Sequence, residues 1–514
     1  MTVRPAERPR LARSVWALAF LALVLHLAVS AAGPYEFHRD ELLYLAMGRH
    51  LQWWRMDFPP FIGAVARLTQ TLGGGLQPWS VRLPSALAGA TLILLAGWTA
   101  RTLGGGAWAQ IVAALAVFTA PLFVRASALF QPVVYDQLWW TLGYVALLIL
   151  ADDDRRRGWA FAAFVVGMGL LTKFSIGFFA VGVVVGVVVL PEWRSRLATV
   201  RPWVAVCGAL LVGSASVVGQ VRLGWPVRGQ LGDLQSSQLA RIGVGDFLKG
   251  QLLLGPAFLL AVVGLWALLV LPAFRRVRIV GVATLASFLC LAALRGKPYY
   301  IGPIYPVLFA AGATIVSGWG VGRRRLMVRW GVVVLLLGFG ALALPFGLPF
   351  LPPAQMARYA ARAGLTSTVT TNYGERLPLP QDYADMLGWK EMVTTVAEVY
   401  HALPERERAA AVVVGDNYGE AGALDLYGPA LGLPPAISSA GSYWFFGPGT
   451  LPGEVVVTLG EEPEGLHQFA DSIVVAAEIT NPWAVPEEQQ IKVLVARRPK
   501  TTVQAVWPLL SERH

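Results

Sequence analysis

The sequence is poor in charged residues and in cysteine. Only 14% of its 514 residues are charged, whereas 55% are hydrophobic and the mean hydropathy is +0.55. An average soluble protein has about 25% charged residues, so this composition excludes a water-soluble globule, a disordered chain and a coiled coil. The two cysteines, Cys207 and Cys290, both lie in apolar runs, which excludes a disulfide framework and a cysteine metal cluster. The chain is therefore predicted to be a polytopic membrane protein.

Apolar stretches long enough for a hydrocarbon core of about 30 Å recur throughout residues 1–349. They predict about eleven transmembrane helices. A signal peptide is the alternative for the first stretch, although its apolar run is longer than a usual signal core. The stretches lie near residues 14–32, 84–103, 107–124, 133–151, 159–171, 174–190, 203–221, 251–273, 279–294, 299–319 and 330–349.

The net charge of +11 is unevenly distributed. Residues 1–349 hold 31 basic and 12 acidic residues, whereas residues 350–514 hold 11 and 19. Because the basic excess belongs to the membrane part, where loop arginines set the orientation, nucleic acid is not an expected partner. With a cytoplasmic N-terminus, the inner loops carry eighteen positive charges and satisfy the positive-inside rule. An odd number of spans then places residues 350–514 on the outer side of the membrane.

Residues 350–514 differ from the membrane part in pattern as well as in charge. A proline-rich entry is followed by strand-like runs that alternate with helical ones, which predicts a small α/β domain on the outer face. Within the transmembrane domain of residues 1–349, two outer loops are long enough to suggest function. These are residues 33–83, where we expect interfacial helices, and residues 222–250. The strand-like runs are residues 410–414, 455–459, 472–477 and 491–496.

Acidic residues concentrate in the first outer loop, which holds Glu36, Asp40, Glu41 and Asp57. Ionisable groups next to apolar surroundings are costly and indicate function. Asp40 precedes a helical stretch at residues 41–51, where the helix dipole favours a carboxylate. One interpretation is that Asp40 only caps this helix. The other is that Asp40, held ionised at the membrane surface, accepts a proton from a substrate hydroxyl.

Three further acids have both a functional and a structural interpretation. Glu41 either orients Asp40 or holds a cation, unless it is an ordinary solvated acid of the first helical turn. Asp57 precedes two prolines that would fix its position, so it either caps a short helix or binds a divalent cation. Asp136 enters a span from its outer end, where it either binds substrate or pairs with Arg125.

Motifs for metal and nucleotide chemistry are scarce. His38 and His50 are too isolated in the sequence to predict a metal site, and we expect both to be surface histidines. The sequence contains no His-Glu-x-x-His motif, no P-loop and no nucleophile elbow. No cofactor is therefore predicted, apart from a possible divalent cation.

Several basic residues stand at the predicted outer ends of helices. They are Arg82, Lys173, Arg295 and Lys297. The phosphate of a lipid carrier would lie at this depth, and arginine forks and lysine charges both suit phosphate oxygens. The alternative is that each cation only extends toward lipid headgroups.

Seven segments follow one another along nearly the whole chain and form a recognisable set. They are His38-Arg-Asp-Glu-Leu-Leu-Tyr44, Asp57-Phe-Pro-Pro60, Arg82-Leu-Pro-Ser-Ala86, Gly169-Leu-Leu-Thr-Lys173, Lys297-Pro-Tyr-Tyr300, Asn417-Tyr-Gly-Glu-Ala-Gly422 and Ser442-Tyr-Trp-Phe-Phe-Gly447. Together these segments resemble bacterial family 39 glycosyltransferases, which are similar to protein O-mannosyltransferases and to the lipid A aminoarabinose transferase. The most specific part of the resemblance is the Asp-Glu pair in the first outer loop.

The resemblance implies a GT-C fold and the transfer of a sugar, with inversion, from a polyprenyl-phosphate donor. It implies that Asp40 is the base that deprotonates the acceptor hydroxyl and that Glu41 supports it. Arg82 and Lys297 would hold the departing phosphate, and we add Lys173 and Arg295 to this group. The acceptor would be a lipid, a glycan or a protein on the outer face, and membrane lipids are the remaining expected partners.

The sequence departs from the family pattern in one segment of the first outer loop. Asp57 stands where some relatives have the acid of a Glu-Lys-Pro segment, but Phe58 replaces the lysine. We keep Asp57 as a candidate metal ligand. The residues assigned to substrate binding are Tyr44, Asp136, Tyr299 and Tyr300.

Other functions remain as alternatives. A transporter or flippase for a lipid-linked glycan would need polar residues at mid-membrane depth, whereas the predicted spans carry almost no charge at their centres. A non-catalytic partner in envelope assembly would dock other enzymes through residues 350–514. A ligase that transfers a whole oligosaccharide is a third alternative.

Overall fold

The computed structural model describes residues 10–73, 77–364, 370–371, 374–460, 467 and 469–512. The chain divides into two compact units. The helical unit consists of Met1–Ala32, Arg82–Val218 and Gln235–Leu348. The mixed unit consists of Gly33–Val81, Gly219–Leu234 and Pro349–His514, so segments far apart in the sequence fold together in it.

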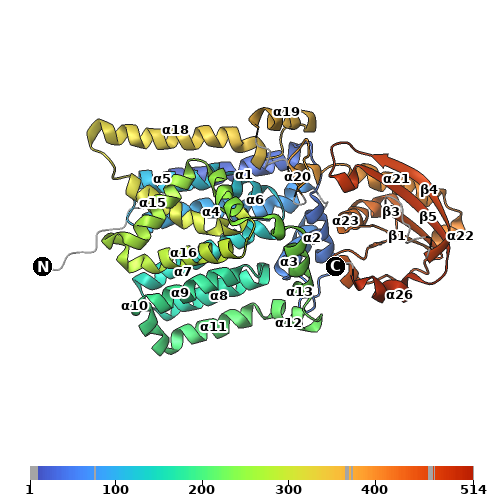
Figure 1. Cartoon of the computed structure of the whole chain (residues 1–514), viewed down its shortest axis with the longest axis horizontal. Helices are drawn as coiled ribbons and strands as arrows, with labels where there is room; N and C mark the ends of the chain where they lie inside the picture. The colour runs from blue at the N-terminus through green and yellow to red at the C-terminus, as the bar shows by residue number, and fades with distance from the viewer. Residues whose placement is uncertain are drawn as a thin grey trace. The chain divides into compact units, whose positions relative to one another are not determined.

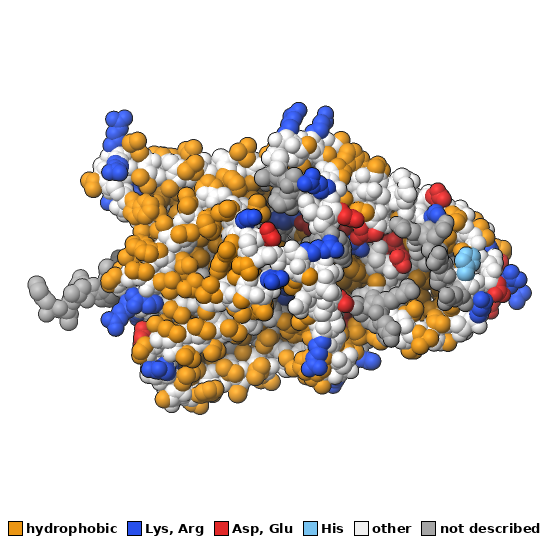
Figure 2. Space-filling model, viewed as in Figure 1, with side chains coloured by type: hydrophobic (Ala, Val, Ile, Leu, Met, Phe, Trp, Pro, Cys, Tyr) orange, Lys and Arg blue, Asp and Glu red, His pale blue; other side chains and the backbone are white. Residues whose placement is uncertain are grey.

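The helical unit is built from apolar helices, labelled in Figure 1. Large hydrophobic side chains, such as Val184 on α9 and Leu211 on α11, stay exposed on these helices, and Figure 2 shows such side chains across the visible surface of the unit. Exposed apolar surface of this extent suits contact with lipid. The helices are α1 (Arg13–Ala32), α4 (Pro78–Thr102), α5 (Ala107–Thr119), α6 (Pro121–Ala128), α7 (Pro132–Asp152), α8 (Arg156–Thr172), α9 (Ile176–Val189), α10 (Pro191–Arg194), α11 (Val200–Val212), α12 (Ser214–Arg222), α14 (Val244–Gly250), α15 (Ala257–Val270), α16 (Arg278–Ala293), α17 (Tyr305–Val316) and α18 (Gly322–Gly347).

Six described helices are long and apolar enough to cross a membrane, and up to ten spans result if each of four bent pairs is one span. The sequence predicted about eleven. The difference is the stretch at residues 159–171, which lies in α8, a helix of 17 residues. The number eleven therefore stays a prediction, whereas the positions of the apolar helices agree with the sequence.

The bends follow from proline and glycine. The α5–α6 pair bends by 60° at Pro121, and α9 bends by 103° against the helical turns that begin at Pro191. Proline lacks an N–H and keeps the preceding residue extended, as Ala120 and Leu190 are. The other two bends, of 54° and 108°, lie at Gly213 and at Gly255.

Glycines let neighbouring helices of this unit approach closely. A Cβ added to Gly264 on α15 would lie 2.0 Å from the Leu308 carbonyl oxygen, and one added to Gly312 on α17 would lie 2.0 Å from the Leu260 carbonyl oxygen. Such reciprocal contacts are typical of helix packing in membranes. There the hydrophobic driving force between helices is missing, and small residues allow the close van der Waals packing that holds helices together.

The mixed unit combines short helices with one sheet. Its five strands have the order β2-β1-β3-β5-β4, in which β1 is parallel to β2 and β3, while β5 is antiparallel to β3 and β4. The strands are β1 (Ala411–Val414), β2 (Ala436–Ile437), β3 (Val455–Gly460), β4 (Ala470–Thr480) and β5 (Gln490–Pro499). The helices are α2 (Arg39–Arg49), α3 (Phe61–Leu72), α13 (Pro226–Ser237), α19 (Pro353–Ala363), α20 (Gln381–Ala384), α21 (Trp389–Ala402), α22 (Glu405–Ala409), α23 (Tyr418–Tyr427), α24 (Ser442–Phe446) and α26 (Val503–Val506).

The predicted α/β character of the C-terminal segment is confirmed. All four strand-like runs correspond to strands, and β2 is the one that the sequence did not indicate, because it is only two residues long. Val412, Val456 and Ala496 belong to the core beneath one face of the sheet, where Trp507 also packs. Hydrophobic residues on alternate strand positions account for this buried face.

Candidate active site

The first turn of α2 is held by a reciprocal capping box. The Nδ1 atom of His38 accepts the backbone N–H of Asp40 at 3.1 Å, and Glu41 Oε2 accepts the backbone N–H of His38 at 2.8 Å. The N-cap is therefore His38, and the interpretation of Asp40 as the cap is wrong. Glu41 is fully buried, so it is not a solvated acid either. Its carboxylate stabilises the turn that carries Asp40.

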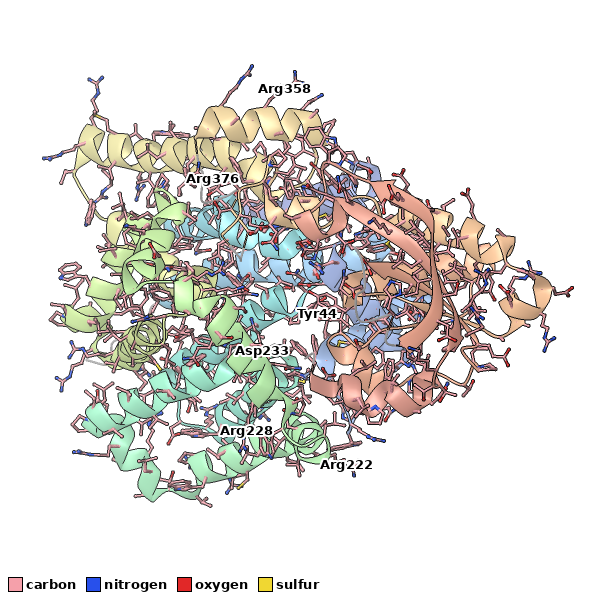
Figure 3. The ribbon with its side chains drawn as sticks, turned by 45° about the vertical axis from the view of Figure 1, so that its right-hand side comes forward. Tyr44, Arg222, Arg228, Asp233, Arg358 and Arg376 are labelled. Carbon is pink, nitrogen blue, oxygen red and sulfur yellow. The ribbon has the colours of Figure 1, made fainter. Side chains whose placement is uncertain are left out.

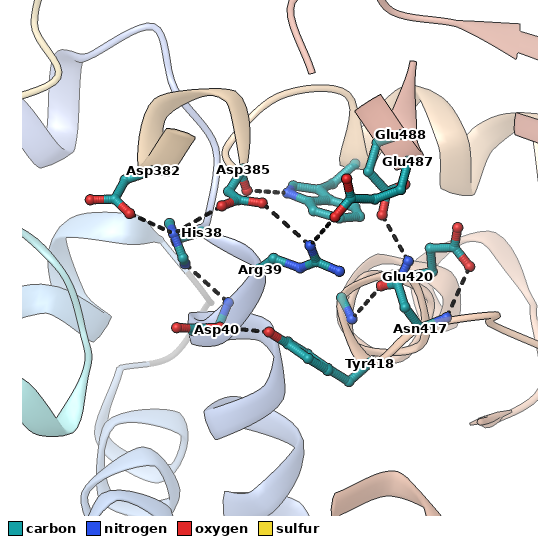
Figure 4. A network of polar contacts seen from close by, with 12 residues as sticks. His38, Arg39, Asp40, Asp382, Asp385, Asn417, Tyr418, Glu420, Glu487 and Glu488 are labelled. Atoms are coloured by element: carbon teal, nitrogen blue, oxygen red, sulfur yellow. Dashed lines mark hydrogen bonds and ion pairs between the residues drawn. The ribbon is translucent and has the colours of Figure 1, made fainter. Parts of the chain in front are cut away.

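Asp40 is half-buried and has a tyrosine partner from the C-terminal segment. The hydroxyl of Tyr418, the first residue of α23, donates to Asp40 Oδ1 at 3.0 Å (Figure 4). Tyr44, which is labelled in Figure 3, lies one turn further along α2 and is buried within electrostatic reach of this carboxylate. Burial, followed by the charge of Asp40, raises the pKa of Tyr44 well above its ordinary value. Tyr44 is therefore a neutral hydroxyl beside the acid.

Arg39 connects the same turn to other acidic segments. Its Nη1 atom lies 2.8 Å from Glu487 Oε1 and 3.6 Å from Asp385 Oδ1, and its guanidinium lies 5.1 Å from the centroid of the Tyr418 ring (Figure 4). An arginine that contacts two carboxylates and an aromatic face loses its freedom to rotate. The sequence did not single out Arg39.

His38 is not at the surface, as the sequence had suggested, but buried against acids. Its Nε2 atom lies 3.8 Å from Asp382 Oδ1 and 3.7 Å from Asp385 Oδ2. One imidazole and two carboxylates are suitable ligand types for a divalent cation. However, Nδ1 already accepts the Asp40 N–H, so the proton of the neutral ring is assigned to Nε2. With this capping bond in place, Nε2 faces the carboxylates as a donor and offers no lone pair to a metal.

The charges around His38 favour a proton on its Nε2 atom. Burial alone would lower the pKa of His38, but the nearby carboxylates of Asp382, Asp40 and Asp385 outweigh burial and raise it. The pKa of the Asp385 carboxyl is also raised, to about 6, because burial outweighs the charges of His38 and Arg39, which lower it.

Asp57 occupies a second polar cluster in the mixed unit. Its side chain is 1% exposed, and its Oδ2 atom accepts the Ser442 hydroxyl at 2.7 Å and the Gln230 amide at 3.3 Å. Burial raises the pKa of Asp57 although these hydrogen bonds lower it. Through the hydrogen bond from Ser442, Asp57 links the first loop to the segment that begins at Ser442. Its role as a metal ligand stays a prediction.

In the helical unit, the Lys173 ammonium group lies near the rings of Tyr299 and Tyr300, two residues that the sequence assigned to substrate binding. Its Nζ atom lies 4.7 Å from the ring centroid of Tyr300 and 5.9 Å from that of Tyr299. Asp136 is within electrostatic reach of Lys173 and accepts the Ser175 hydroxyl at 2.7 Å. The structure thus brings together a lysine, an aspartate and two tyrosines that the sequence had placed on three separate segments.

The loop that carries Lys297 and both tyrosines is anchored by a glutamine. Gln251 accepts the Tyr305 hydroxyl at 2.6 Å, and its amide donates to the Pro298 carbonyl at 3.2 Å. Gln251 is buried, and the sequence did not indicate it because a single amide in an apolar run carries no motif. The hydrogen bonds fix the backbone immediately after Lys297.

The remaining predicted phosphate ligands differ in burial. Arg82 is 2% exposed and lies on α4, at the start of the second segment of the helical unit. Arg295 is exposed and has a positive φ of 53°, a conformation that is uncommon for a residue with a Cβ. The Arg295 guanidinium makes no hydrogen bond or ion pair within the described part of the chain, so the structure does not join Arg295 to Lys173 and the tyrosines.

Two buried glutamates flank the start of α23. Glu488 accepts the Asn417 amide at 2.8 Å, and Glu420 Oε2 accepts the backbone N–H of Asp416 at 2.6 Å (Figure 4). Burial raises the pKa of Glu488 to about 7, and burial together with the charge of Glu488 raises that of Glu420 well above its ordinary value. These two acids and Asp385 make the mixed unit sensitive to pH.

We predict that Glu488→Gln stabilises the protein at pH 8 and has little effect at pH 4. A carboxyl whose pKa is raised in the folded state stabilises the fold below its ordinary pKa of about 4.5, and this stability is lost as the pH rises through about 7. Glutamine keeps an oxygen for Asn417 without the charge. Thermal unfolding at both pH values measures the effect, with the exposed Glu398→Gln as control. A lower unfolding temperature at pH 8 would contradict the prediction.

Comparisons with known proteins bear on the fold of the chain. Residues 57–218 match the family model described as dolichyl-phosphate-mannose-protein mannosyltransferase. No curated protein sequence matches the chain significantly.

Solved structures match over most of the chain. ArnT from Cupriavidus metallidurans bound to undecaprenyl phosphate is 17% identical with a TM-score of 0.61, and the match covers 94% of this chain and 97% of ArnT. The Archaeoglobus fulgidus oligosaccharyltransferase in its apo form is 12% identical with a TM-score of 0.50, over 81% of this chain and 63% of that one. These matches confirm the resemblance found in the sequence: the chain has the GT-C fold and is similar to protein O-mannosyltransferases and to ArnT.

Proposed function

We propose that the protein is an inverting glycosyltransferase that transfers a hexose or pentose from a polyprenyl-phosphate donor to an acceptor hydroxyl at the outer face of the membrane. The observation that carries this proposal is the carboxylate of Asp40, which a buried capping box and a tyrosine donor hold in place. The ArnT structure with undecaprenyl phosphate supports a lipid-linked donor here too. The acceptor is a lipid, a glycan or a protein of the cell envelope.

Asp40 acts as the general base of the transfer. It accepts the proton of the acceptor hydroxyl while the acceptor oxygen attacks the anomeric carbon from the side opposite the phosphate. The bond between the anomeric carbon and the phosphate oxygen breaks, and polyprenyl phosphate leaves with the bonding electrons. Because phosphate is a good leaving group, the protein has to supply mainly a base, positioning and stabilisation of charge. Glu41 supports Asp40 by stabilising the helical turn.

The basic residues of the helical unit stabilise the departing phosphate. Lys173 is one of them, and the rings of Tyr299 and Tyr300 border its ammonium group. Lys297 precedes these tyrosines, and Arg82 and Arg295 supply further positive charge. We assign Tyr44, Asp136, Tyr299 and Tyr300 to substrate binding, where hydroxyls and aromatic rings suit a sugar.

The orientation of the chain follows from the charges of its loops. We infer that the N-terminus is cytoplasmic and that residues 350–514 lie outside the plasma membrane, because the short acid-free loop at residues 322–325 is expected on the inner side. Nucleotide sugars are cytoplasmic, so an outward-facing site needs a donor that is carried by a lipid.

We predict that Asp40→Asn lowers turnover by about 10²–10⁴-fold, because asparagine cannot accept the proton. The substitution keeps an oxygen for the Tyr418 hydroxyl, and His38 still caps the helix, so expression, unfolding temperature and donor binding should stay close to the parent. The assay uses purified protein in lipid with radiolabelled polyprenyl-phosphate hexoses and pentoses, followed by mass spectrometry of the product. The exposed Asp471→Asn serves as control. Full activity of Asp40→Asn would remove Asp40 from the mechanism, and recovery at raised divalent cation would assign it to a metal.

We predict that Lys173→Met weakens donor binding by roughly 10–100-fold, the loss expected for a hydrogen bond to a charged group worth about 1.5–3 kcal/mol. Methionine keeps the apolar stem but removes the charge. Titration with the polyprenyl-phosphate sugar measures binding, and the exposed Lys249→Met, also in the helical unit, is the matched control. Unchanged donor affinity with a lower unfolding temperature would make Lys173 a structural counterion of Asp136.

We predict that a cysteine introduced by Asp471→Cys on β4 reacts with a membrane-impermeant maleimide on intact cells. In the same cysteine-free background, made by replacing Cys207 and Cys290 with alanine, Arg324→Cys should react only after lysis. Both positions are exposed. Protection of the cysteine at position 471 until lysis would reverse the proposed orientation.

A further inference from the structure

We propose that Tyr418 is a positioning residue for Asp40, so that the C-terminal segment completes the active site. This inference rests on the proposed role of Asp40 as the base. The phenol O–H donates to Asp40 Oδ1 at 3.0 Å and so restricts the rotation of the carboxylate. The carboxylate is then presented to the acceptor hydroxyl in one orientation.

The start of α23 places Tyr418 through its own capping box. Asn417 Oδ1 accepts the backbone N–H groups of Gly419 at 2.8 Å and Glu420 at 3.1 Å, while the Asn417 amide donates to Glu488 at 2.8 Å. Tyr418 is therefore the first residue of a helix whose N-terminus is fixed on both sides. Its backbone has little freedom to move relative to the rest of the mixed unit.

Two glycines allow α23 to approach α2 closely enough for this hydrogen bond. A Cβ added to Gly422 would lie 2.7 Å from Leu42 Cβ and 2.9 Å from the Leu42 carbonyl carbon. A Cβ added to Gly419 would lie 3.1 Å from Arg39 Cβ. Larger residues would push the two helices apart, so the Asn417–Gly422 segment combines a helix cap, a hydroxyl donor and two sites of close approach.

The phenol is held as a donor by its surroundings. Burial, followed by the negative charge of Asp40, raises the pKa of Tyr418 well above its ordinary value, so the O–H stays protonated. The Arg39 guanidinium lies 5.1 Å from the centroid of the same ring and is tied to Glu487 and Asp385. The ring is thus fixed from one side by a cation and at its hydroxyl by the proposed base.

Positioning of this kind affects chemistry more than binding. Misplacing a reacting group by about 1 Å can cost on the order of 10²-fold in rate. A tyrosine that only stabilised the fold would instead change the unfolding temperature and leave turnover per folded molecule unchanged.

The mixed unit contains a matched control for this distinction. Tyr443 donates to Asp425 Oδ2 at 2.8 Å, and both residues are buried. Tyr443→Phe therefore removes the same type of hydrogen bond from the same unit without touching Asp40.

The test measures kcat, the KM for the donor and the unfolding temperature of Tyr418→Phe and Tyr443→Phe in the full-length protein, with activity expressed per folded molecule. We expect kcat to fall about 10–100-fold in Tyr418→Phe, with donor KM within about twofold of the parent, because the carboxylate is no longer held in the orientation needed for the reaction. Tyr443→Phe should lower only the unfolding temperature. Equal kcat values in both variants would overturn the proposal.

A double-mutant cycle separates this inference from the proposed function. If Tyr418 acts through Asp40, adding Tyr418→Phe to Asp40→Asn should lower kcat little further, because the two effects are not additive. Additive losses would show that Tyr418 acts elsewhere and would overturn the inference while leaving Asp40 as the base. Full activity of Asp40→Asn would instead overturn the proposed function itself.

Discussion

The capping box of α2 is the constraint on which the candidate site depends. The side chains of His38 and Glu41 satisfy backbone N–H groups that would otherwise be unpaired at the start of a buried helix. Because both are used in this way, Asp40 is the one acid of the first turn that remains half-buried and faces Tyr418. Because Nδ1 of His38 is used by the cap, the ring proton is assigned to Nε2. Nε2 then faces the carboxylates of Asp382 and Asp385 as a proton donor and not as a metal ligand. Local helix chemistry thus decides which acid of the first turn can take the proposed role of general base.

Much of the fold could be predicted from the sequence because the signals are local. Apolar runs located the membrane helices, and short strand-like runs between helical segments located four of the five strands. The bends were not predicted, although each lies at a proline or glycine, because a membrane helix can accommodate either residue without a break. Chain order also did not show that residues 33–81 and 219–234 fold with the C-terminal segment, since such grouping depends on contacts between distant residues.

The residues of the candidate site likewise fall into those that the sequence could indicate and those that only the structure shows. Asp40, Lys173 and the tyrosines at 299 and 300 could be selected from composition and position, because few polar residues stand in an apolar chain. The partners Tyr418, Arg39 and Gln251 could not, because their roles depend on which helix packs against which. Asp40 could also not be separated from His38 as the helix cap, since aspartate has the stronger capping preference and a histidine cap is recognised only from the orientation of its ring.

The short β2 and the irregular β4 also affect whether strands of other molecules can add to the sheet. Both are edge strands, and a regular exposed edge invites strand addition from a neighbouring chain. β2 has only two residues, and the pairing of β4 with β5 shifts register between Val475 and Ala477. Val474 and Val475 are about half exposed beside this bulge, which twists the strand locally. The shortness of β2 and the bulge in β4 therefore limit strand addition at the two edges of this sheet.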